Sequence, residues 1–398
     1  MPVPRRLLAP LVLLLLAACA APPPGPVRRL LPADFADLPG WERDDPRPAL
    51  AAFLRGCTRI RPWRADRPMD RDGDPRFGTV GDWQRLCRRA RALAGAEATT
   101  VRRFFVRHFR PWAVDDGRGR EGLFTGYYEP LLEGALRPDA RFRWPVHRRP
   151  PELVEVDLGL FREDLRGRRI AGRVDDDGRL RPFPDRAAIE RGVLAGRGLE
   201  LLWVDDPIGL FFLHIQGSGR VRLRDGRTLR LVYAGQNGHP YRAIGRDLVE
   251  MGALAPEEVS LFTIRAWLEA HPAAAPALMR RNPSYVFFRL AGEVREGEGP
   301  PGTLGVPLTP ARSIAVDRRF WPLGIPFFLD VPVPFPEGER PWRALVVAQD
   351  TGGAIRGVVR ADVFWGTGPR AEWIAGHMRA RGRMWVLLPR RTMRVADR

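Results

Sequence analysis

Three aspartates in the C-terminal part of the chain each stand in or directly after an apolar segment. Asp350 follows Val346 and Val347 and precedes a Thr-Gly-Gly turn, and Asp362 lies twelve residues further on in an apolar run. Asp317 ends the segment Ser-Ile-Ala-Val-Asp. Because a carboxyl group is costly to bury unless it is paired or protonated, and a general acid must hold a proton near neutral pH, this spacing indicates acid–base chemistry. A purely structural interpretation explains the same spacing: an Asx turn at Asp350, an exposed strand position for Asp362 and a simple turn at Asp317.

Composition excludes several other kinds of chemistry. Every basic residue among the 398 is Arg, so a P-loop lysine and a Schiff-base lysine are both excluded. The net charge of +18 suits an anionic partner, but the arginines are scattered among acidic residues and no nucleic-acid-binding motif is present. We therefore predict no nucleic-acid partner. His214 and His377 lack metal-ligand spacing, so we predict no metal, and we predict no cofactor. An acidic extracellular polymer fits the charge at least as well.

The N-terminus predicts export. Arg5 and Arg6 precede an apolar stretch over residues 7–18, which is about 18 Å long as a helix and too short for a bilayer core of ~30 Å. Leu-Ala-Ala-Cys19 resembles the lipobox of bacterial lipoproteins, which implies a signal peptide over residues 1–19 and a lipid on Cys19. The residue after Cys19 is not Asp, which in such lipoproteins implies the periplasmic face of the outer membrane; residues 20–26 are a Pro-rich tether. An ordinary signal peptide with a chance cysteine is the alternative.

Two cysteines remain after processing. Cys57 and Cys87 each lie on an apolar face of a predicted helix, over residues 50–60 and 83–93. In an oxidising periplasm a disulfide between packed helices is plausible, and two buried free thiols are the alternative. A catalytic cysteine is disfavoured because neither has a nearby His or a Gly-rich turn.

The chain changes character near Gly122. Residues 27–112 are predicted to be mainly helical, whereas aromatic and β-branched runs with Gly and Pro punctuation follow, with a helical interlude after Pro256. Since the strands do not alternate regularly with helices, a β-rich barrel with helices is favoured over a doubly wound sheet. The predicted strands are 123–128, 201–204, 210–216, 229–233, 327–331, 345–349, 358–363 and 384–388.

Several ordered motifs resemble one family. The three aspartates look like the three-Asp domain of the membrane-bound lytic transglycosylase A family, and the resemblance extends from about residue 50 to 390. Any one of these motifs alone is weak, but their common order is specific. The other motifs are Gly-Leu-Phe-Thr-Gly-Tyr-Tyr-Glu-Pro over 122–130, His-Ile-Gln-Gly-Ser-Gly over 214–219, Tyr-Ala-Gly-Gln-Asn-Gly over 233–238 and Asn-Pro-Ser-Tyr-Val-Phe-Phe over 282–288.

The resemblance implies a fold that is mainly β with helices. A double-psi β-barrel domain would be built from residues 27–130 and 281–398, where the first part also carries the N-terminal helices and the second the three-Asp motif. Residues 131–280 would form an inserted substrate-binding β-domain, with a groove between the two domains for a glycan strand.

The resemblance also implies a reaction. Asp362 matches the family's catalytic acid, supported by Asp350 and Asp317, in an exolytic transglycosylase that cleaves the β-1,4 bond between N-acetylmuramic acid and N-acetylglucosamine of peptidoglycan. One carboxyl protonates the leaving oxygen and then deprotonates the muramyl C6 hydroxyl, which attacks C1 and leaves a 1,6-anhydromuramyl end. Because the nucleophile belongs to the substrate, no second protein carboxylate is needed, unlike in ordinary glycosidases.

Substrate-binding residues are expected in the same motifs. One of the adjacent tyrosines should face the groove and the other the core, and the glycines after Gln216 let the backbone approach a ligand. Trp365 is expected either to stack on a sugar or to pack in the core. The full predicted set is Thr125, Tyr127, Tyr128, Gln216, Gly217, Ser218, Gln236 and Asn237.

Two rival functions are kept. A hydrolase would need a second carboxylate, for which Glu129 is the candidate, at about 5–9.5 Å from Asp362. A non-catalytic peptidoglycan-binding lipoprotein would have lost its acid, yet all three aspartates are present. Partner proteins are not indicated by any motif.

Overall fold

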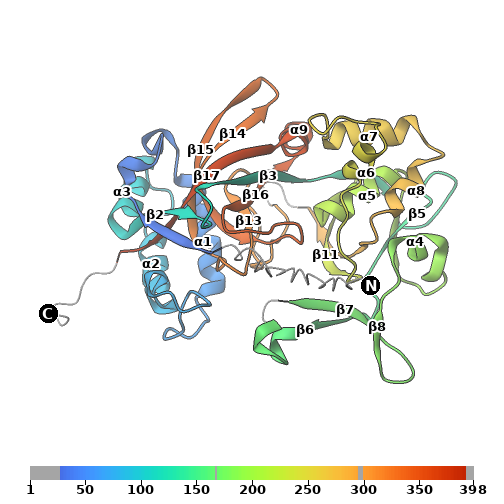
Figure 1. Ribbon diagram of the computed structural model, residues 1–398, viewed down its shortest axis with the longest axis horizontal. Coiled ribbons are helices and arrows are strands. Elements are labelled where there is room, and N and C mark those ends of the chain that lie inside the picture. The colour runs from blue at the N-terminus through green and yellow to red at the C-terminus, as the bar shows by residue number, and fades with distance from the viewer. Residues whose placement is uncertain (1–26, 166–167, 295–298, 391–398) are drawn as a thin grey trace, which may run out of the picture.

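The structure is a computed structural model that describes residues 27–165, 168–294 and 299–390. The predicted signal peptide, Cys19 and the tether lie outside the described residues. Two bodies lie side by side, a barrel that carries the first three helices and a second body that contains most of the middle of the chain (Figure 1).

A closed six-stranded barrel forms the first body. Each strand pairs with the next in the ring, and the antiparallel pairing of the last strand with the first closes it. Two of the six pairings are parallel, so the barrel is mixed. The ring runs through β3 (Glu121–Glu129), β16 (Arg360–Thr367), β13 (Ser313–Val316), β15 (Gly338–Asp350), β14 (Pro326–Phe335) and β17 (Arg379–Pro389), and β2 (Phe109–Asp115) and β1 (Arg29–Pro32) extend it from β17.

Three amphipathic helices share the hydrophobic core of this barrel. They are α1 (Arg47–Ile60), α2 (Val80–Arg91) and α3 (Ala98–His108), and their buried side chains join the apolar residues of β14, β15 and β17 in one cluster. A disulfide joins Cys57 of α1 to Cys87 of α2, 30 residues apart in sequence. The covalent link therefore fixes the two helices against each other beside the barrel.

Reducing this disulfide should destabilise the barrel domain. Closing a loop of this length lowers the free energy of folding by about 3–4 kcal/mol through the unfolded chain. We expect dithiothreitol and the double variant Cys57→Ala/Cys87→Ala to lower Tm by several degrees, measured by calorimetry. Equal Tm values for oxidised and reduced wild type would contradict this expectation.

The second body is built on a six-stranded sheet. It pairs, in order, β12 (Val286–Glu293), β11 (Thr228–Gln236), β10 (Ser218–Leu223), β4 (Leu131–Ala135), β9 (Glu200–Val204) and β5 (Trp144–His147). Helices α5 (Pro207–Gln216), α6 (Ile244–Glu250), α7 (Leu261–Ala270) and α8 (Ala275–Arg280) pack around it, and the short α4 (Arg186–Ala188) lies nearby. A small sheet of β6 (Val154–Asp157), β7 (Arg169–Val174) and β8 (Leu180–Pro182) projects from this body (Figure 1). The predicted fold class, a β-barrel with an inserted β-domain, is confirmed.

One predicted strand is wrong. Residues 210–216 belong to α5, whose Asp206 side chain accepts a hydrogen bond from the Gly209 amide at the N-terminus. Gly217, with φ of 76°, ends the helix in the left-handed conformation. Because this helix is apolar on nearly all sides, its sequence lacks the helical period and looks like a buried strand.

Strand β3 connects the two bodies, and helix α9 (Pro369–His377) contacts α7 near the same junction. Phe262 of α7 stacks on His377 with ring centroids 4.7 Å apart.

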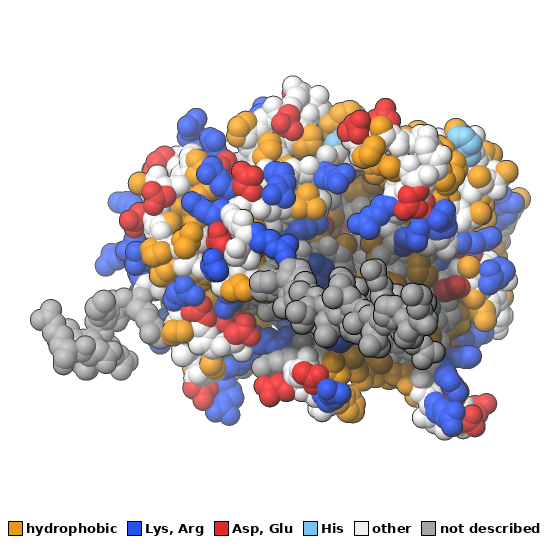
Figure 2. Space-filling view, viewed as in Figure 1, with side chains coloured by type: hydrophobic (Ala, Val, Ile, Leu, Met, Phe, Trp, Pro, Cys, Tyr) orange, Lys and Arg blue, Asp and Glu red, His pale blue; other side chains and the backbone are white. Residues whose placement is uncertain are grey.

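Among the described residues, no helix has the length and hydrophobicity that a membrane span requires. Arginine side chains are spread over the visible face among acidic ones, in agreement with their scatter in the sequence (Figure 2).

Candidate active site

Four neighbouring barrel strands place four residues in one row. Asp362 on β16 is in register with Thr125 on β3 and with Ala315 on β13, and Ala315 is in register with Asp350 on β15. Residues in register on paired strands point to the same face of a sheet. The row therefore brings Thr125 together with three residues that lie 190 to 237 positions further along the chain: Ala315, Asp350 and Asp362.

Asp362 is held by a short relay of donors. The Thr125 hydroxyl donates to Asp362 Oδ1 at 2.6 Å, and Arg360 Nη2 donates to the Thr125 hydroxyl at 2.8 Å. Burial raises the pKa of Asp362 above its ordinary value, although the charge of Arg360 and the Thr125 hydrogen bond oppose this and Asp350 adds to it. A carboxyl with a raised pKa can deliver a proton, which is what a general acid does.

Asp350 has a different environment. Its Oδ1 accepts hydrogen bonds from the Thr303 amide, the Thr303 hydroxyl and the Thr351 amide at 2.8–2.9 Å, and its Oδ2 accepts one from the Tyr127 hydroxyl at 2.9 Å. Burial still raises the pKa of Asp350. Burial beside Asp350 also raises the pKa of Tyr127 far above its usual range, so its hydroxyl stays protonated and donates. Because both of its oxygens accept hydrogen bonds from fixed donors, the Asp350 carboxyl group is held in one position as a hydrogen-bond acceptor.

Asp317 does not join this pair. Its buried carboxylate binds the Arg319 guanidinium at 2.6 Å and accepts the Gly357 amide at 2.8 Å. Burial alone would raise the pKa of Asp317, but Arg319 and the Gly357 amide outweigh it, and the pKa lies below its usual range. The third aspartate is therefore ionised and fixes the loop before β16.

Replacing Thr125 by Val should shift the pH dependence of any reaction that uses Asp362 as an acid. The Thr125 hydrogen bond favours the carboxylate, so its loss raises the pKa of Asp362 further. A hydrogen bond to a charged group is worth about 1.5 kcal/mol, or roughly one pKa unit. The alkaline limb of the kcat/KM profile should move up by about one pH unit, while Thr125→Ser leaves it in place; an unmoved limb in Thr125→Val would contradict the relay.

The adjacent tyrosines point to different places. Tyr127 reaches Asp350, whereas the Tyr128 hydroxyl donates to Glu372 Oε1 of α9 at 2.8 Å. Trp365 lies in the core, where its indole contacts Trp342 at 5.0 Å between centroids and donates to the Met378 sulfur. Of these aromatic residues, Tyr127 is therefore the one that joins the aspartate pair.

The predicted residues of the 214–219 motif lie at the junction of the two bodies. Gln216 Oε1 accepts the backbone amide of Tyr128 at 3.1 Å, so this side chain connects α5 to β3. Gly217 ends α5, and the buried Ser218 begins β10. The structure thus brings Gln216 to the strand that carries Thr125.

Two further predicted residues bind the protein's own backbone. The Gln236 amide donates to the His239 carbonyl at 2.9 Å and to the Ser284 hydroxyl at 2.6 Å. Asn237 is fully buried; its Nδ2 donates to the Pro184 and Pro283 carbonyls, and its Oδ1 accepts the Tyr285 amide. Asn237 therefore holds the loops of the second body together.

Sequence reasoning missed two residues of the site, Arg360 and Thr303. Arg360 stands two positions before Asp362 on β16, and side chains two apart on a strand share a face, so this signal was available. Thr303 lies near the start of the described range 299–390. It reaches Asp350 only through tertiary packing, for which the sequence carries no local signal.

Glu129, the candidate second carboxylate, is fully engaged. It is buried at the end of β3, and its two oxygens contact Arg220 and Arg230 at 2.7 Å each. Thr125 is the β3 partner of Asp362, and Glu129 lies four residues further along that strand, or about 13 Å at 3.3 Å per residue. Glu129 is therefore well separated along the strand from the position that pairs with Asp362.

The second body and the barrel strands that carry the aspartate pair each match the model of a known protein family. Residues 123–289 match the model of the MltA specific insert domain, and residues 312–388 match that of the 3D domain. The insert match runs from within β3 to the first half of β12, and the 3D match contains both Asp350 and Asp362.

Relatives that match two thirds or more of this chain identify the family. The protein named membrane-bound lytic murein transglycosylase A is 35% identical in Vibrio cholerae, over 67% of this chain and 65% of that relative, slightly less than two thirds of its length. In Escherichia coli K12 it is 31% identical over 78% of this chain and 75% of the relative. The chain belongs to the membrane-bound lytic murein transglycosylase A family.

Solved structures agree with this assignment. The crystal structure of membrane-bound lytic murein transglycosylase from Agrobacterium tumefaciens has a TM-score of 0.79 at 36% identity, covering 90% of this chain and 97% of that one. MltA from Neisseria gonorrhoeae, in its monoclinic form, gives 0.73 at 32% identity over 92% and 96%. E. coli MltA with bound chitohexaose gives 0.65 at 26% identity over 92% and 93%.

Proposed function

We propose that this protein is a lytic transglycosylase that cleaves the β-1,4 bond between N-acetylmuramic acid and N-acetylglucosamine of peptidoglycan and leaves 1,6-anhydromuramyl ends. The observation that carries the proposal is the geometry of Asp362, a half-buried carboxyl with a raised pKa that accepts one hydrogen bond from Thr125, itself bound by Arg360, whereas the neighbouring Asp350 accepts four. Exolytic cleavage belongs to the same proposal.

Asp362 performs both proton transfers. Its proton goes to the glycosidic oxygen as the bond from C1 to that oxygen breaks. The resulting carboxylate then takes the proton of the muramyl C6 hydroxyl, whose oxygen forms the new bond to C1. The carboxyl is regenerated, no water is consumed, and the Thr125 hydroxyl and Arg360 stabilise the carboxylate between the two steps.

The geometry favours this reaction over hydrolysis. Glu129 lies about 13 Å along β3 from the partner of Asp362, and its oxygens contact two arginines. Asp350 accepts four hydrogen bonds from fixed donors, so it is suited to orient Tyr127 and the sugar rather than to activate water. A substrate hydroxyl therefore serves as the nucleophile.

The glycan strand is proposed to lie between the two bodies, across the row that contains Thr125, Asp362 and Asp350. Support comes from the E. coli relative, whose structure was solved with chitohexaose. The barrel is proposed to comprise 27–130 and 281–398, and the inserted domain 131–280. The mature chain is proposed to be attached by a lipid on Cys19 to the periplasmic face of the outer membrane, since relatives are named membrane-bound.

Product analysis tests the proposal. A soluble form that lacks residues 1–19 is incubated with purified sacculi, and the muropeptides are separated by mass. Anhydro ends are one water lighter than reducing ends. Anhydro ends are the expected product; reducing ends would identify a hydrolase, and intact sacculi with a folded protein would favour a binding module.

A further inference from the structure

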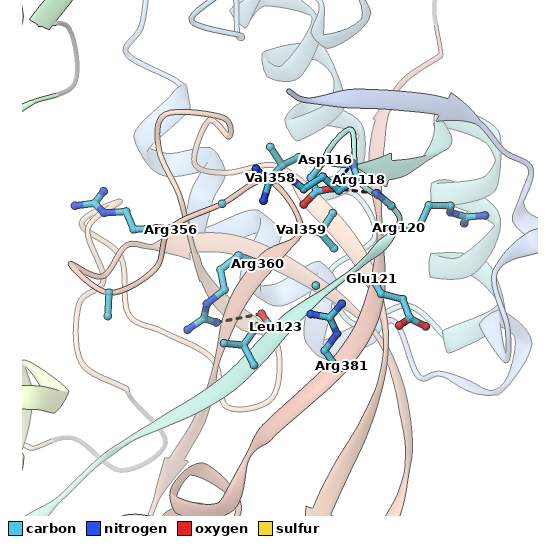
Figure 3. A pocket seen from close by; sticks show the side chains of 14 residues that line it. Asp116, Arg118, Arg120, Glu121, Leu123, Arg356, Val358, Val359, Arg360 and Arg381 are labelled. Atoms are coloured by element: carbon cyan, nitrogen blue, oxygen red, sulfur yellow. Dashed lines mark hydrogen bonds between the residues drawn. The ribbon is translucent and has the colours of Figure 1, made fainter. Parts of the chain in front are cut away.

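A strongly basic pocket of about 690 Å³ is lined by Arg360, two residues before Asp362 on β16. The start of β3, the loop before β16 and β17 form its walls (Figure 3). Figure 3 shows Arg360 and Arg381 to either side of Leu123. Five arginines line the pocket against two carboxylates: Arg118, Arg120, Arg356, Arg360 and Arg381, with Asp116 and Glu121.

These arginines lack carboxylate partners. Within the described ranges, none of the five makes an ion pair, although many other arginines of the chain do. Arg120 Nε is buried without a hydrogen-bond partner in this part of the structure. Arg118, Arg356 and Arg381 are exposed, so their guanidinium groups are free to contact a ligand. Unpaired charges gathered in a pocket fit an anion.

The glycan strand itself does not supply that anion. Its sugars are N-acetylated, and the lactyl carboxyl of each stem-bearing muramic acid is consumed in an amide bond to the peptide. The negative charge of peptidoglycan resides in the free carboxylates of its stem peptides. An arginine fork matches a carboxylate in geometry as well as in charge.

We propose that the pocket binds the carboxylates of the stem peptide on the strand cleaved at Asp362, an inference that rests on the proposed function. Arg360 lines the pocket and also donates to Thr125, which donates to Asp362. Two hydrogen bonds thus separate the stem site from the acid. Strands that carry peptide stems are therefore the preferred substrate, and bare glycan is cleaved less efficiently.

The test compares two substrates. Glycan strands with their stem peptides, and the same strands stripped of stems by an amidase, are digested by wild type and by Arg356→Gln/Arg381→Gln. Release of anhydro ends gives kcat/KM for each substrate. The ratio of stem-bearing to stripped substrate should exceed one for wild type and fall about tenfold in the variant, because charge-assisted hydrogen bonds are lost.

Arg88→Gln is the matched control, because it removes one exposed charge on α2 outside the pocket and should keep the wild-type ratio. A ratio near one for wild type, or one that is unchanged in the double variant, would overturn the stem site alone. Release of reducing ends, or of no ends, from both substrates would overturn the proposed function and this inference with it. Because Arg88, Arg356 and Arg381 are exposed, both variants should fold, and equal Tm values would verify this.

Discussion

Asp362→Asn should form anhydro ends about a thousandfold more slowly than wild type, because the only proposed proton donor is replaced by an amide of the same shape. The variant keeps an acceptor for the Thr125 hydroxyl, so the row of residues should stay in place. Mass analysis of digested sacculi measures the loss. Activity within tenfold of wild type would assign the acid to another residue.

The same substitution should stabilise the fold at neutral pH. Burial raises the pKa of Asp362 in the folded state, so the folded protein holds this proton more tightly than the unfolded chain. Its contribution to stability is therefore present below the unfolded pKa and is lost as the pH rises through the folded pKa. The amide has no proton to lose, so Tm of the variant should exceed that of wild type above the folded pKa.

Asp317→Asn is the matched control with the opposite sign. The pKa of Asp317 is lowered, so its carboxylate stabilises the fold above the unfolded pKa and this stabilisation is lost in acid. Its replacement should lower Tm at pH 7 and have little effect at low pH. Equal responses of the two variants to pH would mean that Arg319 and the Gly357 amide do not distinguish Asp317 from Asp362.

Glu129→Ala should lower the free energy of unfolding by about 3 kcal/mol, because it removes a buried carboxylate that both Arg220 and Arg230 contact. The two arginines belong to β10 and β11 of the second body, whereas Glu129 belongs to β3 of the barrel. The loss should therefore also loosen the junction, which limited proteolysis and calorimetry detect together.

Glu133→Gln is the control for this second prediction, since Glu133 pairs with Arg222 at an exposed site, where ion pairs contribute little. Glu129→Gln separates structure from catalysis. A hydrolase with Glu129 as its base would lose activity in this variant at unchanged Tm, whereas the junction predicts loss of Tm with anhydro ends still formed by the folded fraction.

The sequence predicted the aspartate pair but not how it is held. Asp350 and Asp362 follow buried runs, a local pattern that can be read without a structure. Their contacts with Thr303 and Thr125 depend on pairing between strands far apart in the chain. Asp317 shows the limit, because the Arg two residues later, rather than its apolar run, decides its charge state.

Helix α5 shows why one element was misassigned. Its run of large apolar side chains hides the helical period, since α5 is buried on several sides, and His214 lies inside against Tyr285 and Phe288. The signals at its ends were present, with Asp206 and Pro207 at the start and Gly217 at the stop. End signals deserve more weight than periodicity for a short buried helix.

Closure of the barrel by β17 on β3 has a consequence for biosynthesis. The two strands are separated by 250 residues, and β3 leaves the ribosome long before its partner. Until β17 is made, β3 and β14 each lack a neighbour, so the barrel is open and the row of Thr125 and Asp362 is held on that side by the pairing of β3 with β16 alone. Contacts between residues so far apart in sequence form slowly and are expected to form after the local ones. A chain that ends before β17 is thus an open sheet whose site residues are present but not enclosed in a barrel, and we expect full wall-cleaving activity only when the last strand is in place.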